Sequence, residues 1–444
     1  MATAATQLQS RDQLTQRLSD SRAVTDQLFR VVRKEALYDR PIAERHRIVF
    51  YIGHLEAFDW NLVGGQTLDL GAIHPEFDRL FAFGIDPVGG GLPTDQPSDW
   101  PRLGEIEAYN HQVRRRLDQI LSDGPASGWK YPREVVLNVA IEHRLMHAET
   151  LAYMFHQLPY DRKAAPPDYR SIYSSQVAGP AITPRMLDIP AGTATLGLAR
   201  GGSPFGWDNE FELQPVEVPA FAVDAYKVTN GDFLQFVDAG GYEDGTLWSE
   251  ADWAWINEQD VAHPSFWRER GGQWFYRGMF EELPLPLDWP VYVSYAEAAA
   301  YARFTGKALP TEAEFHRFAY GTPEGPERAY PWGDAPPTES QGNFDFHRWD
   351  PAAVGSYPCG RSAFGAEDTL GNGWEWTASQ FAPLPGFEPF PFYRGYSANF
   401  FDGQHYVIKG ASPRTAACML RRSFRNWFQP HYPYVYASFR CVSR

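Results

Sequence analysis

The first 160 or so residues place apolar side chains at helical spacing, with good helix formers between them. Apolar residues at i, i+3, i+4 and i+7 share one helix face, so each such segment offers a stripe that must pack against a neighbour. Four segments of this kind follow one another, which predicts an all-α four-helix bundle. The predicted helices span 11–36, 43–65, 103–122 and 131–157.

The helical pattern stops at 158–184, LPYDRKAAPPDYRSIYSSQVAGPAITP. This stretch is rich in Pro, Ser and Ala and has no apolar period, so we interpret it as an interdomain linker. The sequence therefore predicts a bundle over 1–160, a linker over 161–185 and a second domain over 186–444.

From Met186 onward the pattern changes to short strand-like runs, long turns and scattered Trp and Gly. Two helices stand out within it, SYAEAAAYARFTG at 294–306 and TEAEFHRFAYG at 311–321. Thr311 precedes Glu314 by three residues, which predicts a capping box at the start of the second helix.

Three histidines carry the candidate chemistry. His143 and His147 lie four residues apart in IEHRLMHAET, so both imidazoles fall on one helix face. His54 lies in another predicted helix, FYIGHLEAFDW. Imidazoles from two helices can bind one face of a divalent metal and leave the opposite positions open for substrate and dioxygen. Taken alone, the i, i+4 pair fits two unrelated histidines equally well.

Composition narrows the class of protein. The 444 residues are 43% hydrophobic, which is enough for two or three cores. A net charge of -15 argues against nucleic acid binding, since the longest basic run, 114–116, is too short to follow phosphates. The N-terminus lacks a signal-like apolar stretch, so we predict a cytoplasmic protein without membrane spans. Three cysteines without a C-x-x-C pattern indicate neither a disulfide framework nor a zinc knuckle.

Several motifs in the second domain occur in a fixed order, and with the helices at 294–321 they resemble the landmarks of the formylglycine-generating-enzyme fold. That resemblance implies an irregular α+β domain related to C-type lectins. It runs through the whole second domain. The motifs are IPAGTATLG, WDNE at 207–210, YPWGD at 330–334, GNGWEWT at 371–377 and a terminal SFRCV.

A DinB-type bundle with three histidines, followed by such a domain, resembles one enzyme family over nearly the whole chain. This family comprises the non-haem iron sulfoxide synthases of ergothioneine biosynthesis and their selenium-inserting relatives. The resemblance implies Fe(2+) held by His54, His143 and His147, with O2 as co-substrate. It also implies that hercynine, the trimethylbetaine of histidine, receives sulfur or selenium at the imidazole carbon between its two ring nitrogens.

The resemblance assigns three further residues. Glu149 completes the family's H-x-x-x-H-x-E signature, where it either orients a water at the metal or pairs with a surface arginine. Asn426 and Trp427, in RRSFRNWFQPHYPYVY, match the positions that hold the betaine. A quaternary ammonium has no hydrogen to donate, so aromatic faces or oxygen dipoles must bind it. An ordinary core tryptophan is the alternative for Trp427.

The residues expected to bind the second substrate, which donates the sulfur or selenium, depart from the family pattern. Met146 stands where the sulfoxide synthases commonly place a Gln that touches the substrate. In AYNHQVRRR, His111 and Arg114 take the positions of two arginines that grip the donor's carboxylates, so one arginine is lost. Phe428 stands where an Asp can hold the donor's amino group.

The family's catalytic tyrosine lies in a loop after W-E-W-T-x-S, which reads SQFAPLPGFEPFPFYRGYS here. Leu384 aligns with that tyrosine, and Phe387 follows it. Tyr393 or Tyr396 can take the role of proton and electron donor instead.

These departures match the selenoneine synthase branch, whose donor resembles a selenosugar with no carboxylate or amino group to grip. We therefore expect C–Se bond formation between hercynine and a selenosugar. The alternative is a sulfoxide synthase that joins hercynine to cysteine or γ-glutamylcysteine through a rearranged donor pocket.

Two other classes of function stay open at this point. A formylglycine-generating enzyme needs paired cysteines near the C-terminus, and Cys418 has no partner close in sequence. A lectin-like binding module joined to a thiol-transfer or structural bundle needs no redox chemistry. YPWGD and GNGWEWT are interpreted as structural. Short acidic turns such as Asp208, Asn209 and Glu210 can bind Ca(2+), although most are simply solvated.

Overall fold

The computed structural model divides the chain into two compact units, Met1–Tyr169 and Arg170–Arg444. The division falls inside the predicted linker. None of the described helices is long and apolar enough to cross a membrane. The structure describes residues 11–82, 92–123, 128–171, 183–201 and 205–444.

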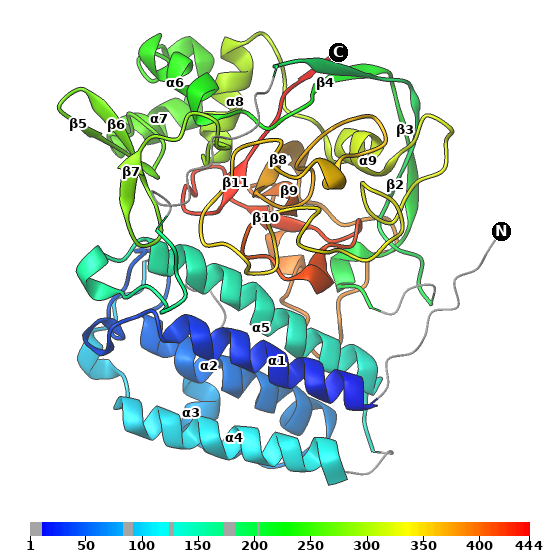
Figure 1. Ribbon diagram of the computed structural model, residues 1–444. Helices are drawn as coiled ribbons and strands as arrows, with labels where there is room; N and C mark the ends of the chain where they lie inside the picture. Colours follow the sequence, from blue (N-terminus) through cyan, green and yellow to red (C-terminus); the bar gives the residue numbers. More distant parts are fainter. Residues whose placement is uncertain (1–10, 83–91, 124–127, 172–182, 202–204) are drawn as a thin grey trace. The chain divides into compact units, whose positions relative to one another are not determined.

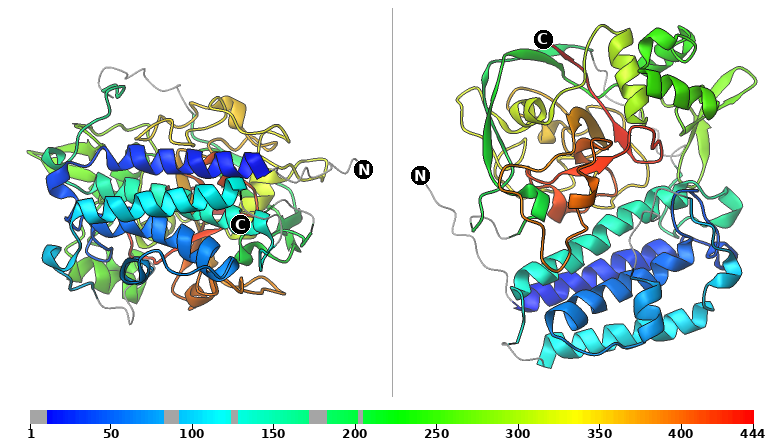
Figure 2. Two further views of the ribbon diagram at one scale, coloured as in Figure 1. Left: turned by 90° about the horizontal axis from the view of Figure 1, so that it is seen from below. Right: turned by 180° about the vertical axis from the view of Figure 1, so that it is seen from behind.

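The first unit is a bundle in which α1, α2, α4 and α5 lie side by side (Figures 1 and 2). Helix α1 packs on α5 and α2 packs on α4. Helix α5 is buried along almost its whole length from Val136 to His156, with its apolar residues spread around the helix rather than confined to one stripe. The helices of this unit are α1 (Arg11–Phe29), α2 (Ile48–Trp60), α3 (Pro75–Leu80), α4 (Leu103–Asp123) and α5 (Arg133–His156).

The predicted first helix is too long, since α1 ends at Phe29 rather than at residue 36. Beyond it Val32 forms a β-bridge with Lys163, and the Ala164 amide donates to the Val31 carbonyl at 2.8 Å. Tertiary pairing with the chain after α5 thus overrides the helix propensity of this segment.

Helix α2 does not stop at Trp60 but widens into a π-helix, η2 (Asn61–Thr67). Such widened turns are often found at functional sites. The short helix α3 was not predicted. Its N-terminus is capped by the His74 side chain, which accepts from the Phe77 amide.

The second unit is built on small sheets joined by long loops. Its central sheet has the order β10-β9-β8-β11, antiparallel except where β11 lies parallel to β8. The other sheets are β1-β4-β12, the two-stranded β2-β3 and β5-β6-β7. Figure 1 shows the four strands of the central sheet inside this unit and the two-stranded β2-β3 ribbon at its edge. The strands are β1 (Met186–Ile189), β2 (Gly192–Leu196), β3 (Gln214–Val218), β4 (Phe221–Asp224), β5 (Trp267–Arg270), β6 (Gln273–Arg277), β7 (Glu282–Pro284), β8 (Gly373–Gln380), β9 (Tyr406–Ala411), β10 (Asn426–Phe428), β11 (Ala437–Ser438) and β12 (Val442–Ser443).

The two helices predicted for this unit are confirmed as α8 (Tyr295–Phe304) and α9 (Glu312–Tyr320). The capping box is confirmed too, since Thr311 accepts from the Glu314 amide while Glu314 accepts from the Thr311 amide. Helix α9 packs on β2, β3, β8 and β9. Two further helices are α6 (Asn230–Asp238) and α7 (Glu250–Glu258).

A buried ion-pair cluster joins two of the landmark motifs. Glu375, in GNGWEWT, accepts from Lys227 Nζ at 2.8 Å and from Arg440 Nε at 2.7 Å. Arg440 belongs to the terminal SFRCV, and all three side chains are fully buried. The charges compensate one another in the core, which gives Glu375 the structural role predicted for its motif.

Candidate active site

His54 lies on the buried face of α2 and is 2% exposed. Its Nδ1 faces the Phe81 carbonyl at 2.7 Å, a contact that requires Nδ1–H to donate. Nε2 is then left with a lone pair, which is the form that binds a metal. Gly53 allows this arrangement, because a Cβ at that position would lie 2.6 Å from the Phe81 ring.

His143 and His147 complete a three-histidine centre with His54. Each offers one ring nitrogen, and the three nitrogens lie within 4.8 Å of one another. The Nε2 atoms of His54 and His147 are 3.2 Å apart. Two nitrogens each about 2.1 Å from one ion, at an angle of about 100°, lie about 3.2 Å apart. Within the described residues, no other group of three or more His, Cys, Asp or Glu side chains is placed to hold a metal.

The protonation state of the three imidazoles also suits a metal. Burial lowers the pKa of His54 to about 4. It lowers the pKa of His143 and His147 well below the usual value, and the neighbouring imidazoles add to this effect. All three are therefore neutral at pH 7, the form that ligates.

Aromatic rings hold the ligand imidazoles in place. The Phe58 ring stacks on His143 with 3.4 Å between centroids, and Phe50 stacks on His54 at 4.8 Å. These apolar side chains fix the orientations of the imidazole rings and keep water away from them. The donor set, three neutral nitrogens on buried side chains, fits a divalent transition metal such as iron.

Two predicted residues lie on α5 beside the ligands. Met146 is half-buried, and Glu149 is buried with 6% of its surface exposed. Glu149 is therefore no solvent-exposed carboxylate, although its role at a metal stays a prediction.

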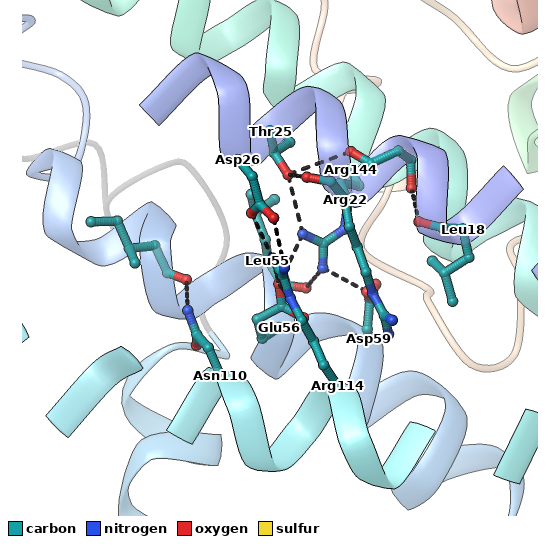
Figure 3. Close-up of polar contacts among 12 residues, drawn as sticks. Leu18, Arg22, Thr25, Asp26, Leu55, Glu56, Asp59, Asn110, Arg114 and Arg144 are labelled. Carbon is teal, nitrogen blue, oxygen red and sulfur yellow. Dashed lines mark hydrogen bonds and ion pairs between the residues drawn. The ribbon is translucent and has the colours of Figure 1, made fainter. Parts of the chain in front are cut away.

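His111 and Arg114, the positions matched to the donor-binding arginines, line one cavity of about 700 Å³ in the first unit. His111 is exposed there. The Arg114 guanidinium is engaged by protein carboxylates: both Nη atoms donate to Asp26 at 2.7 Å, and Nε donates to Glu56 at 2.9 Å (Figure 3). A substrate carboxylate would have to displace one of these partners.

The predicted hercynine-binding pair lies on β10 in the second unit. Trp427 stacks on Phe381 with 4.0 Å between ring centroids and an angle of 7°. Tyr396 meets the Trp427 ring edge-on at 5.5 Å. Asn426 is half-buried, and its Oδ1 accepts from the Trp427 amide at 2.9 Å. These rings form an aromatic group around Trp427, which is half-buried rather than enclosed in the core.

The loop after β8 brings only some of its predicted residues to this aromatic group. Leu384 is 6% exposed and its side chain packs against Gly197, so its position holds no phenol. Phe387 contacts Phe401 edge-on at 5.0 Å.

Of the two candidate tyrosines in this loop, Tyr396 lies beside Trp427 and also stacks on Trp207 at 3.9 Å. Tyr393 contacts Tyr396 at 5.5 Å, and burial raises the pKa of its phenol above the usual value. Phe428, next to Trp427 in the chain, stacks on Tyr432 at 5.6 Å.

The interpretation of WDNE as a solvated turn is wrong, because Asp208, Asn209 and Glu210 are at most 1% exposed. Glu210 accepts from Arg421 Nε at 2.8 Å and from Ser423 at 2.6 Å, so its carboxylate is occupied by a cationic partner. This arrangement offers no calcium cage at Glu210. Its role is to tie the turn to the 421–423 segment.

Sequence reasoning missed three charged residues beside the histidines. Arg144 directly follows His143, and it binds Glu56 and Asp59 on α2. All three are at most 2% exposed. The available signal was the presence of two acidic residues in an otherwise apolar helix, where charges require a buried partner.

Comparison with known proteins shows which family the chain resembles. Residues 175–444 match the sulfatase-modifying factor enzyme 1-like domain family. A hercynine oxygenase of Mycolicibacterium smegmatis is 34% identical over 392 residues, covering 86% of this chain and 86% of the relative. A hercynine oxygenase of Mycolicibacterium thermoresistibile is 34% identical over 406 residues, covering 88% of this chain and 85% of the relative.

Other similar proteins match a smaller part of this chain. The formylglycine-generating enzyme of Mycobacterium tuberculosis is 31% identical over 243 residues, which cover 46% of this chain and 77% of that protein. The structure of PvdO from Pseudomonas aeruginosa covers 58% of this chain and 94% of its own, with a TM-score of 0.37 and 21% identity. By its domain match and its long alignments, the chain belongs to the sulfatase-modifying factor enzyme 1-like family and, within it, to the hercynine oxygenases.

Proposed function

We propose that the protein is a non-haem iron(II), O2-dependent enzyme that forms a C–Se bond between hercynine and a selenosugar, a step of selenoneine biosynthesis. The observation that carries the proposal is the buried centre of His54, His143 and His147, three neutral nitrogens within 4.8 Å of one another. These residues would hold the iron. When bound, it would activate dioxygen and bring the substrates together on its open face.

The acceptor is proposed to be hercynine because of the aromatic group on β10 and the loop after β8. A trimethylammonium group is attracted to the faces of Trp and Tyr rings. Trp427 and Tyr396 supply such rings, and Asn426 supplies an amide beside them. The relatives named hercynine oxygenase support the same acceptor.

The selenosugar donor is supported by what Arg114 binds. Its guanidinium is shared between Asp26 and Glu56, so it is poorly placed to grip the carboxylate of cysteine or γ-glutamylcysteine. The first position of this pattern is His111, whose imidazole lacks the arginine fork. A sugar donor has no carboxylate and needs neither arginine.

A sulfoxide synthase that forms a C–S bond is the second candidate. Two observations favour it: the relatives are named hercynine oxygenases, and Tyr396 places a phenol beside Trp427. In this reading Tyr396, or Tyr393 next to it, serves as the proton donor. For Glu149, buried two residues past His147, we propose that its carboxylate orients a water near the metal.

A donor competition tests the proposal. The protein is loaded with Fe(2+) without oxygen and given hercynine, then air, with equal amounts of cysteine, γ-glutamylcysteine and a 1-selenosugar. Mass spectrometry identifies the products, and the His147→Ala variant is the control. We expect a selenium adduct of hercynine from the native protein and none from the variant. A sulfoxide adduct alone would establish the second candidate, and the absence of any product would refute both.

A further inference from the structure

A polar network lies inside the bundle (Figure 3). Arg144 on α5 is at its centre, with 1% of its side chain exposed. Its Nη1 donates to Glu56 at 3.0 Å, and its Nη2 donates to Asp59 at 2.7 Å. Nη2 also donates to the Leu55 carbonyl at 3.0 Å. One guanidinium therefore holds a full turn of α2.

The network continues to the other two long helices. Glu56 also accepts from Arg114 Nη2 on α4 at 2.7 Å. Arg114 in turn makes its paired contacts with Asp26 on α1. Glu56 is thus a shared acceptor through which α1, α2, α4 and α5 are joined.

The position of this network in the chain is specific. Arg144 follows the ligand His143, and Leu55 follows the ligand His54. The hydrogen bond between Arg144 and the Leu55 carbonyl therefore joins the two helices immediately beside the residues that must converge. Leu55 is 2% exposed, so water does not compete for this carbonyl.

Burying charges of this kind seldom stabilises a fold more than apolar packing of the same volume would. Guanidinium hydrogen bonds are directional, however, and a planar fork fixes both the distance and the rotation of the group it binds. Apolar contacts such as those of Phe50 and Phe58 with the ligand rings lack this directionality. A polar clamp between α2 and α5 is well suited to set the 3.2 Å spacing of the His54 and His147 nitrogens.

We propose that Arg144 is a positioning residue that sets α2 against α5, so that the three histidines meet in the geometry a metal requires. This inference rests on the proposed metal centre. It adds that the metal site depends on a guanidinium that does not touch the metal.

The test compares metal binding by the native full chain with that of Arg144→Met, Arg144→Lys and Glu56→Gln. Co(2+) is the probe, because its visible absorption reports both affinity and ligand geometry. Arg22→Met is the matched control: Arg22 is a buried arginine that donates to Asp118 at 2.7 Å and joins α1 to α4. Melting curves of the metal-free proteins measure their stability. Co(2+) titrations well below the melting temperature then show whether a folded variant has lost the positioning of its ligands.

We expect Arg144→Met to weaken Co(2+) binding about 10- to 100-fold, the range seen when residues that orient metal ligands are removed. The absorption bands at saturating Co(2+) should also shift, a change that a loss of stability alone would not cause. Arg144→Lys should recover part of the affinity, because an ammonium can bind Glu56 or Asp59 but not bridge both as a fork does. Arg22→Met should keep native affinity and bands.

Native affinity and bands in Arg144→Met would overturn the inference. If that variant does not fold, Glu56→Gln with native affinity and bands would overturn it equally. Failure of the native protein itself to bind Co(2+) or Fe(2+) would instead refute the proposed metal centre, so the two failures are distinguishable.

Discussion

His54 and His147 face each other through Nε2 atoms 3.2 Å apart, although 93 positions separate them in the chain. In the metal-free chain His147 Nε2–H can donate to the lone pair of His54 Nε2, and the same spacing suits two nitrogens that bind one ion. The fold therefore brings α2 and α5 together around a metal-binding geometry.

The first prediction concerns metal and stability. Because the ion binds only the folded protein, Co(2+) at about 100 times its dissociation constant should stabilise the native chain by about 2.7 kcal/mol. The His147→Ala variant should show no such gain, and its activity should fall at least about 100-fold. Thermal melts with and without the ion, and with a chelator, measure the effect. An equal gain in the variant would contradict the assignment of His147.

The second prediction concerns Trp427. Substitution Trp427→Leu removes a face for the trimethylammonium group, so the KM for hercynine should rise about 2- to 30-fold, in keeping with a cation–π energy of about 0.5–2 kcal/mol. Trp427→Phe should lose less. Histidine, which lacks the methyl groups, serves as the matched ligand in binding measurements. Equal weakening of histidine and hercynine would indicate a packing role only.

The third prediction separates a donor-binding role of Arg114 from a structural one. Since its guanidinium is bound to Asp26 and Glu56, Arg114→Met should lower the melting temperature but leave the KM for a selenosugar within about twofold. Asp26→Asn is the control, because it weakens the contact between Arg114 and Asp26 while keeping Arg114. A large rise in the KM for a carboxylate donor, with a native melting temperature, would show that Arg114 grips substrate.

The fourth prediction concerns the buried ion-pair cluster of the second unit. Glu375→Gln leaves Lys227 and Arg440 without their buried countercharge, so the free energy of unfolding should fall by about 3–5 kcal/mol. Glu282→Gln is the matched control, since its partner Arg270 is 68% exposed and the loss should stay under about 1 kcal/mol. Urea unfolding monitored by tryptophan fluorescence gives both values. Equal losses would contradict the structural role of Glu375.

The fifth prediction concerns pH. Burial raises the pKa of Asp208 from 3.8 to about 6, so the folded protein binds this proton more tightly than the unfolded chain does. Its contribution to stability is present below pH 4 and is lost as the pH rises to about 6, by roughly 3 kcal/mol at most. Relative to Asp208→Asn, the native protein should therefore lose stability across this window. Urea unfolding between pH 4 and 7 measures the difference, and parallel curves would contradict it.

The candidate site could be predicted in part because its signals are local. The i, i+4 spacing of His143 and His147 needs only helix geometry, and α8 and α9 follow from apolar spacing and a capping box. His54 could be matched to them only through resemblance, since nothing in the sequence says which face of α2 meets α5.

The features that the sequence did not predict depend on tertiary contacts. Arg144 in EHRLMH looks like a surface residue until Glu56 and Asp59 are seen to face it. The early end of α1 depends on Val32 pairing with Lys163, more than a hundred residues away. The buried carboxylate of Asp208 accepts from Ser397, which lies in a distant loop.

The most direct test of the central claim is the spin-resonance spectrum of the protein loaded anaerobically with Fe(2+) and treated with nitric oxide, with and without hercynine. The three-histidine centre predicts one iron per chain, a high-spin iron–nitrosyl signal that hercynine perturbs, and no signal in the His147→Ala variant. A signal that hercynine leaves unchanged, or one that survives in the variant, would contradict the assignment of this centre as the place where hercynine is modified.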